Sequence, residues 1–300
     1  MTNVVLTPRD IEILRLASRI GFLTETQICA LFYSKHDGFE LDLYHARGSL
    51  ARRIKQLVDN GYLAKSTIPV SGTINRVAYL LGPNGAEAIR DTRGVEGHAD
   101  PRWLAKRSGD LLIRSRHDIV ATNFLVNLMM LSKLVPDFTL LDWIPDRDCR
   151  FYVPRGNKKL IVNPDLYVSV INGSPDGSTL FLEVDRDTLD NKSLRIMMLR
   201  YFQYGVSRIY KTDLSSPRFP RICIAAPSTS RLDFIRSAVI AAKENYSGAE
   251  PAHVSRMPFW LATFDNVEIN SLDRGFVTRK PLDPVWVNEF GKPVPSPLLP

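Results

Sequence analysis

Residues 179–185 most restrict what this chain can fold into. Apolar residues at the even positions alternate with Glu183 and Asp185 at odd positions, which is the two-residue period of a β-strand. Both carboxylates therefore lie on one face of the predicted strand. Residues 165–171 predict another strand that begins at Asp165. If the two strands form a hairpin, Asp165 comes close to the other two acids.

Three carboxylates in this arrangement suit a divalent metal ion. Carboxylate oxygens are hard ligands, which Mg²⁺ and Mn²⁺ prefer. A metal bound by Asp165, Glu183 and Asp185 would activate a water molecule and stabilise charge on a phosphate under attack. The alternative is that acids at strand ends are only solvated, and the pattern alone does not separate the two.

The second half of the chain predicts a three-layer α/β domain. Its order is helix, several strands, helix, strand, helix and strand. The predicted helices cover residues 108–134, 189–204 and 230–245. The predicted strands cover residues 139–144, 150–153, 160–162, 165–171, 179–185, 221–226 and 259–264.

The N-terminal region predicts three short helices followed by a hairpin. Thr7 and Pro8 form a helix start, and Thr24 caps a second helix that ends at residue 32. A third helix covers residues 43–60, and the hairpin strands cover 62–65 and 76–80. This order is typical of a winged helix-turn-helix domain.

The outer face of the third helix and the hairpin carry most of the candidate DNA contacts. Residues 44–80 contain six basic residues and one acid, Asp59. We expect the helix to enter the major groove and the hairpin to reach phosphates. The alternative is an ordinary solvated helix face. The predicted DNA-binding residues are His45, Arg47, Ser49, Arg52, Arg53, Gln56, Lys65 and Arg76.

Composition limits the partner and the compartment. The net charge of +7 and the isoelectric point near 9.3 favour a polyanionic partner. No apolar run approaches the length of a membrane helix, and the N-terminus does not resemble a secretory signal, so we expect a cytoplasmic protein. The three cysteines are far apart and predict small buried residues rather than disulfides or a zinc site.

Four segments follow from these patterns. Residues 1–92 predict the winged-helix domain, and residues 93–107 predict a linker. Residues 108–268 predict the α/β domain. Residues 269–300 predict a proline-rich tail whose end is extended or mobile.

Several motifs together resemble the replication-relaxation family. They are residues 6–10, 51–63, 79–86, Arg116 to Asp118, Pro164 with Asp165, and residues 181–188. Proteins of this family occur on plasmids and integrated mobile elements. They join a winged helix to a domain similar to the PD-(D/E)xK restriction-endonuclease fold, and a related branch includes mobilisation relaxases that nick transfer origins.

The resemblance implies roles for particular residues. Asp165 matches the first acid of the nuclease motif and Glu183 matches the second. Asp185 stands where an active nuclease carries lysine, which would orient the water and stabilise developing charge. Lys192 could supply that charge from the next helix. An inactive nuclease fold that serves as a DNA-binding or assembly platform is the alternative.

Two other kinds of chemistry are less well supported. His117 could approach the carboxylates, but a lone histidine on an apolar helix face is more often a core residue. Tyr201, Tyr204 and Tyr210 could suggest a covalent tyrosine relaxase. That class needs clustered histidines, and the five histidines here are scattered.

The leading hypothesis is a DNA-binding protein of a mobile element that acts in replication or mobilisation. Its winged helix would recognise double-stranded DNA, and its nuclease-like domain would engage or nick that DNA with Mg²⁺ or Mn²⁺. The alternative is a transcriptional regulator whose inactive nuclease-like domain dimerises or binds a partner. Other replication or mobilisation proteins of the element, and a second copy of the chain, are the protein partners considered.

Overall fold

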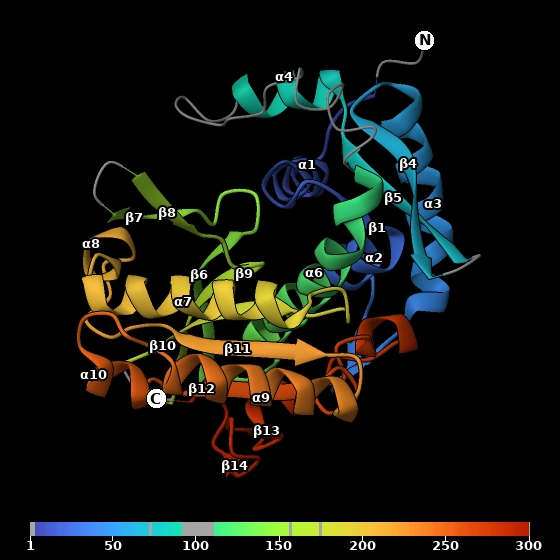
Figure 1. Ribbon diagram of the computed structural model, residues 1–300. Coiled ribbons are helices and arrows are strands. Elements are labelled where there is room, and N and C mark those ends of the chain that lie inside the picture. The colour runs from blue at the N-terminus through green and yellow to red at the C-terminus, as the bar shows by residue number, and fades with distance from the viewer. Residues whose placement is uncertain (1–3, 72–73, 92–110, 156–157, 174–175, 300) are drawn as a thin grey trace. The chain divides into compact units, whose positions relative to one another are not determined.

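The computed structural model describes residues 4–71, 74–91, 111–155, 158–173 and 176–299. It divides into two compact units, which Figure 1 shows in one view. Unit 1 comprises Met1–Met130 and Ser271–Val277, and unit 2 comprises Leu131–Asn270 and Thr278–Pro300. The predicted linker, residues 93–107, lies outside the described residues.

Unit 1 begins with two capped helices. Thr7 caps α1 (Pro8–Ile20) in a capping box with Asp10, and Pro8 provides the fixed φ of the first helical position. Thr24 caps α2 (Glu25–Phe32) in the same way with Gln27. Each box satisfies backbone N–H groups that have no partner within the helix. The starts predicted from Thr7 and Thr24 are confirmed.

The third helix and a hairpin complete the N-terminal arrangement. Helix α3 (Leu43–Asp59) ends before Gly61, whose positive φ of 70° suits glycine. Strands β4 (Leu63–Ser71) and β5 (Ile74–Leu81) pair antiparallel, and β1 (Leu23–Thr24) pairs with β5, so the sheet order is β1-β5-β4. Helix α4 (Pro83–Asp91) follows. The hairpin is longer than predicted at both strands.

A late segment of the chain belongs to unit 1. The short strands β2 (His36–Asp37) and β3 (Glu40–Leu41) form a hairpin. The Leu41 N–H donates to the Gly275 carbonyl over 2.8 Å, and the Val277 N–H donates to the Phe39 carbonyl over 2.8 Å. The 3₁₀ helix η1 (Ser271–Arg274) precedes these contacts. The structure thus divides the predicted tail between the two units.

Helix α6 (Leu111–Leu134) leads into the sheet of unit 2. That sheet has seven strands in the order β14-β13-β12-β11-β10-β9-β6. Its strands are β6 (Phe138–Pro145), β9 (Leu166–Asn172), β10 (Ser178–Val184), β11 (Arg221–Ala226), β12 (Phe259–Thr263), β13 (Trp286–Val287) and β14 (Pro293–Val294). The first three pair antiparallel, whereas β10, β11 and β12 are parallel.

Helices cover one face of this sheet. Helices α7 (Asn191–Ser207) and α9 (Thr229–Glu244) lie side by side along β10 and β11 (Figure 1). Their apolar residues share one core with Phe181, Ile222 and Phe259 of the strands. The shorter helices α8 (Tyr210–Asp213), α10 (Pro251–Ser255) and η2 (Lys280–Leu282) complete the unit.

A hairpin is inserted between β6 and β9. Strands β7 (Phe151–Arg155) and β8 (Lys158–Val162) form a separate two-stranded sheet that packs on α7. The C-terminal residues join the main fold, because β13 pairs with β12 and Trp286 is fully buried. All three cysteines are buried, as the sequence predicted.

Candidate functional site

Helix α3 presents a polar outer face in unit 1. Leu50, Ile54 and Leu57 are buried, whereas Arg52 and Gln56 are exposed. Ser49 is also exposed, and Lys55 pairs with Asp59 one turn further along over 2.5 Å. His45 and Arg47 lie on the same helix, but their side chains lie outside the described part of the structure. The face therefore keeps Arg52 directed to solvent.

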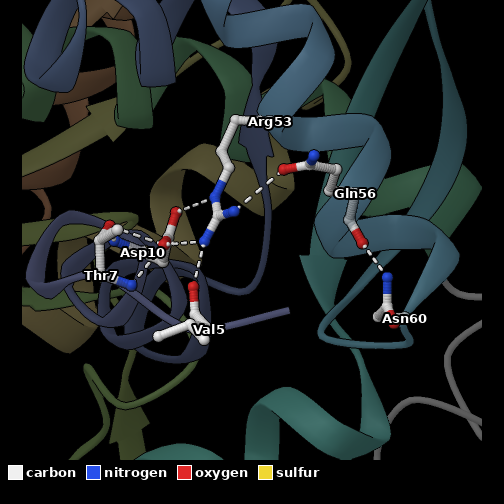
Figure 2. A network of polar contacts seen from close by, with 6 residues as sticks. All are labelled: Val5, Thr7, Asp10, Arg53, Gln56 and Asn60. Carbon is white, nitrogen blue, oxygen red and sulfur yellow. Dashed lines mark hydrogen bonds and ion pairs between the residues drawn. The ribbon is translucent and has the colours of Figure 1, made fainter. Parts of the chain in front are cut away.

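Arg53 is held inside unit 1 by a polar network (Figure 2). Its Nη2 donates to Asp10 Oδ2 over 2.6 Å and its Nε donates to Asp10 Oδ1 over 3.1 Å. It also donates to the Val5 carbonyl over 2.8 Å and to Gln56 Oε1 over 2.9 Å. Asp10 is only 1% exposed. Arg53 thus joins α3 to the start of α1.

The hydrogen bonds of this network lower the pKa of Asp10. Burial raises the pKa of its carboxyl, but hydrogen bonds from Arg53 and Thr7 outweigh burial and hold the pKa below its usual value. The same bonds raise the pKa of Arg53. Each partner stabilises the charge of the other, so this part of the predicted DNA-binding face also serves the fold.

The two basic residues of the β4–β5 hairpin also differ: one is exposed and the other is paired with an acid. Lys65 on β4 is exposed. Arg76 on β5 donates from Nη1 to Asp273 Oδ1 over 2.6 Å, and both side chains are partly buried. Asp273 belongs to the late segment of unit 1. Of these two basic residues, Lys65 is therefore the exposed one, and Arg76 anchors η1.

In unit 2 the sheet brings Asp165 and Glu183 to neighbouring strands. Leu166 pairs with Leu182 in the β9–β10 register, so Asp165 precedes β9 beside the end of β10. The Val184 N–H donates to Asp165 Oδ2 over 2.6 Å. The neighbourhood predicted from a strand hairpin is thus present for this pair of acids.

The pKa values of both carboxyl groups are raised. Burial, followed by the charges of Asp146 and Asp185, raises the pKa of Asp165 to about 7. Burial and the charge of Asp165 raise the pKa of Glu183, although the Tyr201 hydroxyl donates a hydrogen bond to Glu183 Oε1. Both side chains are partly buried, and acids with raised pKa values are typical of functional sites.

Asp185 has a different environment from the other two acids. Arg231 of α9 donates from Nε to Asp185 Oδ1 and from Nη2 to Asp185 Oδ2, both over 2.8 Å. The two side chains are 3% and 7% exposed. Arg231 also donates to the Leu189 carbonyl over 2.6 Å. This bidentate pair ties the end of β10 to α9 and occupies the position where the family resemblance would place lysine.

A pocket of about 330 Å³ opens beside Glu183. Asn163, Ser193, Arg200 and Tyr201 contribute polar groups to its lining. Lys192 is exposed on the first turn of α7 and does not line this pocket. Arg200 lies two turns further along the helix and does line it. Arg200 is therefore a cation of α7 that lines the same pocket as Glu183.

A family model confirms the resemblance. The model described as replication-relaxation matches residues 14–214, which is more than half of the chain. The chain belongs to the replication-relaxation family. No curated protein and no solved structure matches it. The matched span covers most of unit 1 and, in unit 2, both Asp165 and Glu183.

A metal site of three side chains needs metal-ligating groups that lie close together. Within the described residues, no three side chains of His, Cys, Asp or Glu form a group that could hold a metal ion. Asp185 pairs with Arg231, and the predicted metal site of Asp165, Glu183 and Asp185 stays a prediction. Asp165 and Glu183 each keep one carboxylate oxygen outside the hydrogen bonds to Val184 and Tyr201.

Of the three tyrosines considered for a covalent mechanism, Tyr201 and Tyr204 are buried and hydrogen-bonded to carboxylates. Tyr201 donates to Glu183, and Tyr204 donates to Asp213 Oδ2 over 3.0 Å. Burial and the neighbouring carboxylates raise the pKa of both phenols, which disfavours a phenolate nucleophile. The side chain of His117 lies outside the described part of the structure.

Sequence patterns missed several residues around the candidate site. Asp146 lies close because its N–H donates to the Asp165 carbonyl over 2.9 Å, and Asn163 donates to Asp146 Oδ1. Asp146 follows the Trp143-Ile144-Pro145 end of β6, and an acid directly after a predicted strand was the available signal. Arg231 lies on a helix face that offers no comparable signal.

Among the described helices, none has both the length and the apolar character needed to cross a lipid bilayer.

Proposed function

We propose that this family member is a DNA-binding protein that acts in the replication or mobilisation of a plasmid or integrated mobile element. The observation that carries the proposal is the exposed polar face of α3, with Arg52 and Gln56 directed to solvent beside buried Leu50 and Ile54. A recognition helix needs this division between a packed face and a free face.

The order of elements in unit 1 supports a winged helix. Helices α1, α2 and α3 precede the β4–β5 hairpin, and Lys65 on that hairpin is exposed. In this proposal α3 enters the major groove, and Lys65 contacts a phosphate of the flanking backbone. Arg53 and Arg76 support the surface from within, because both are paired with aspartates of unit 1.

The order of elements in unit 2 supports a domain like the PD-(D/E)xK nucleases. Helix α6 precedes the antiparallel strands β6, β9 and β10, and α7 then crosses to β11, which is parallel to β10. Asp165 and Glu183 lie on adjacent strands of this arrangement. We assign them the positions of the two acids of the nuclease motif.

The proposal includes a divalent metal ion held by two protein carboxylates instead of three. Mg²⁺ commonly uses only one or two protein carboxylates, together with water and substrate phosphate. Asp165 and Glu183 are the two candidates, and a metal held there would stabilise charge on the phosphate under attack. Arg200 lies in the adjoining pocket and would bind a phosphate oxygen through its guanidinium.

A second candidate function is DNA binding without catalysis. The buried pair of Asp185 and Arg231 fills the position where an active nuclease carries lysine. That observation favours a unit that binds DNA or a partner protein without cutting, as in a transcriptional regulator.

Binding of a mixed-sequence DNA duplex to the full chain tests the proposal. Fluorescence anisotropy should detect binding that weakens steeply as salt rises, because phosphate contacts release counterions. Binding that is undetectable at low salt would refute the proposal.

Supercoiled plasmid separates the two candidate functions. Incubation with Mg²⁺ or Mn²⁺ should give nicked circles that Asp165→Asn abolishes, while duplex affinity stays unchanged. Intact plasmid together with normal duplex binding would favour the non-catalytic function. A nick that persists in Asp165→Asn would exclude the carboxylate site.

A further inference from the structure

The β7–β8 hairpin of unit 2 has one buried face and one free face. Phe151, Val153 and Val162 are buried in the core beneath it. Tyr152 and Ile161 point away from that core, with exposures of 46% and 43%, and they are direct cross-strand partners. Two large apolar side chains thus lie side by side and partly exposed to solvent. Packing of the hairpin on α7 does not account for their apolar character.

The charge of the hairpin is positive. Residues 150–162 contain Arg150, Arg155, Lys158 and Lys159 and no acidic residue. Lys159 is exposed, and its Nζ lies 5.6 Å from the centre of the Tyr152 ring. Arg150 is exposed at the start of the hairpin. The exposed aromatic ring therefore stands in a cationic surrounding.

This combination suits unpaired nucleotides. Proteins bind single-stranded nucleic acid by stacking bases on aromatic side chains and tracking the phosphates with basic residues. Base pairs within a duplex do not offer their faces for such stacking. A protein partner would need acidic groups to complement the cations, whereas a nucleic acid supplies both a base face and a phosphate at each step.

We propose that the outer face of the β7–β8 hairpin binds single-stranded DNA, with Tyr152 stacking on a base and Lys159 contacting a phosphate. This inference rests on the proposed DNA-binding function, and it specifies that one surface of the protein binds single-stranded DNA. The hairpin ends at Val162, and Val162 and Asn163 line the pocket that contains Glu183 and Arg200. A strand bound on the hairpin would lead directly to the candidate site.

The test uses the full chain and a fluorescein-labelled oligo(dT) of about 20 nucleotides, which exceeds typical site sizes. Tyr152→Ala should weaken binding roughly tenfold, whereas Tyr152→Phe should bind as the wild type does because the ring remains. Lys159→Ala should lower the salt slope by about one. Phe290→Ala is the matched control, since Phe290 is another aromatic residue of unit 2 and is 62% exposed.

Parallel measurement of duplex binding keeps the outcomes distinct. If the wild type binds duplex but Tyr152→Ala leaves the oligo(dT) affinity unchanged, the inference fails and the proposed function stands. If the wild type binds neither DNA, the proposed function fails. If Tyr152→Ala reduces self-association and not oligo(dT) affinity, the face is a protein contact and the inference is wrong. Unchanged unfolding curves for the variants exclude a folding defect.

Discussion

The pKa values of carboxyl groups shift in opposite directions in the two units. In unit 1, Asp10 is paired with Arg53, and its pKa is lowered. In unit 2, Asp165 and Glu183 gather near other acids, and their pKa values are raised. Burial acts in the same direction at both places. The difference comes from the partner, because hydrogen bonds from an arginine overcome burial at Asp10.

Unit 2 contains an internal control for this comparison. Asp185 is only two residues from Glu183, yet Arg231 binds it with two hydrogen bonds. Two acids that are close in sequence at the end of β10 thus have different partners. Asp185 has a buried cation as its partner, whereas Asp165 and Glu183 lie near other acids, an arrangement that reduces stability and is common at functional sites.

The largest effect is expected from breaking the pair of Asp185 and Arg231. Arg231→Leu leaves a buried carboxylate without its cation and should lower the free energy of unfolding by about 3–5 kcal/mol. Urea unfolding followed by tryptophan fluorescence measures it, since Trp143, Trp260 and Trp286 lie in unit 2. Arg218→Ala is the control, because its pair with Asp176 is exposed and should contribute less than about 1 kcal/mol.

The double variant Asp185→Leu with Arg231→Leu sharpens this prediction. It removes both charges and should recover much of the stability lost in the single variant. If the double variant is no more stable than Arg231→Leu, the loss comes from packing and the pair is not the cause.

A smaller effect is expected from Arg53→Ala in unit 1. Asp10 keeps its bonds to Thr7 but loses the charged donor, which should cost about 2 kcal/mol. Hydrogen exchange of the amides in α1 measures the local opening free energy. Unchanged protection of α1 would show that Arg53 is not needed to hold it.

The lowered pKa of Asp10 predicts how the stability of unit 1 depends on pH. Its stabilising effect is complete above the unfolded pKa of about 3.9 and is lost as pH falls through the lower folded pKa. Asp10→Asn should therefore be less stable than the wild type at pH near 6, and the difference should shrink in acid. Hydrogen exchange of α1 in both proteins across this range tests it. A difference that grows in acid would have the wrong sign.

The smallest stability effect is expected at Asp165, and it has the opposite direction. Asp165→Asn keeps an acceptor for the Val184 N–H and removes a partly buried charge that lies near other acids. The free energy of unfolding at neutral pH should rise by about 1 kcal/mol. A clear loss of stability in urea unfolding would mean that Asp165 serves the fold.

Local patterns predicted most elements because the signals lie within a few residues. Capping residues Thr7 and Thr24 located two helix starts, and strand alternation placed Glu183 beside Asp165. Long-range partners could not be predicted in this way. Arg231 follows Asp185 by 46 residues, and Asp10 precedes Arg53 by 43. Only the packing of α9 on α7 and of α3 near α1 decides which charges meet.

The C-terminal residues illustrate the same limit. Eight prolines from residue 251 onward predicted a tail, since proline lacks the N–H for regular pairing. In the structure Trp286 and Leu298 are buried, and short strands extend the main sheet. Burial of a few large apolar side chains outweighs the poor strand propensity of the segment.

The most direct test of the central claim compares two neighbouring arginines on α3. Duplex affinity and hydrogen exchange of α1 are measured for Arg52→Ala and Arg53→Ala in the full chain, with Arg90→Ala on α4 as an exposed control. We expect Arg52→Ala to lose duplex affinity several-fold with unchanged exchange, whereas Arg53→Ala should accelerate exchange. Unchanged duplex affinity in Arg52→Ala would contradict the assignment of α3 as the DNA-binding helix.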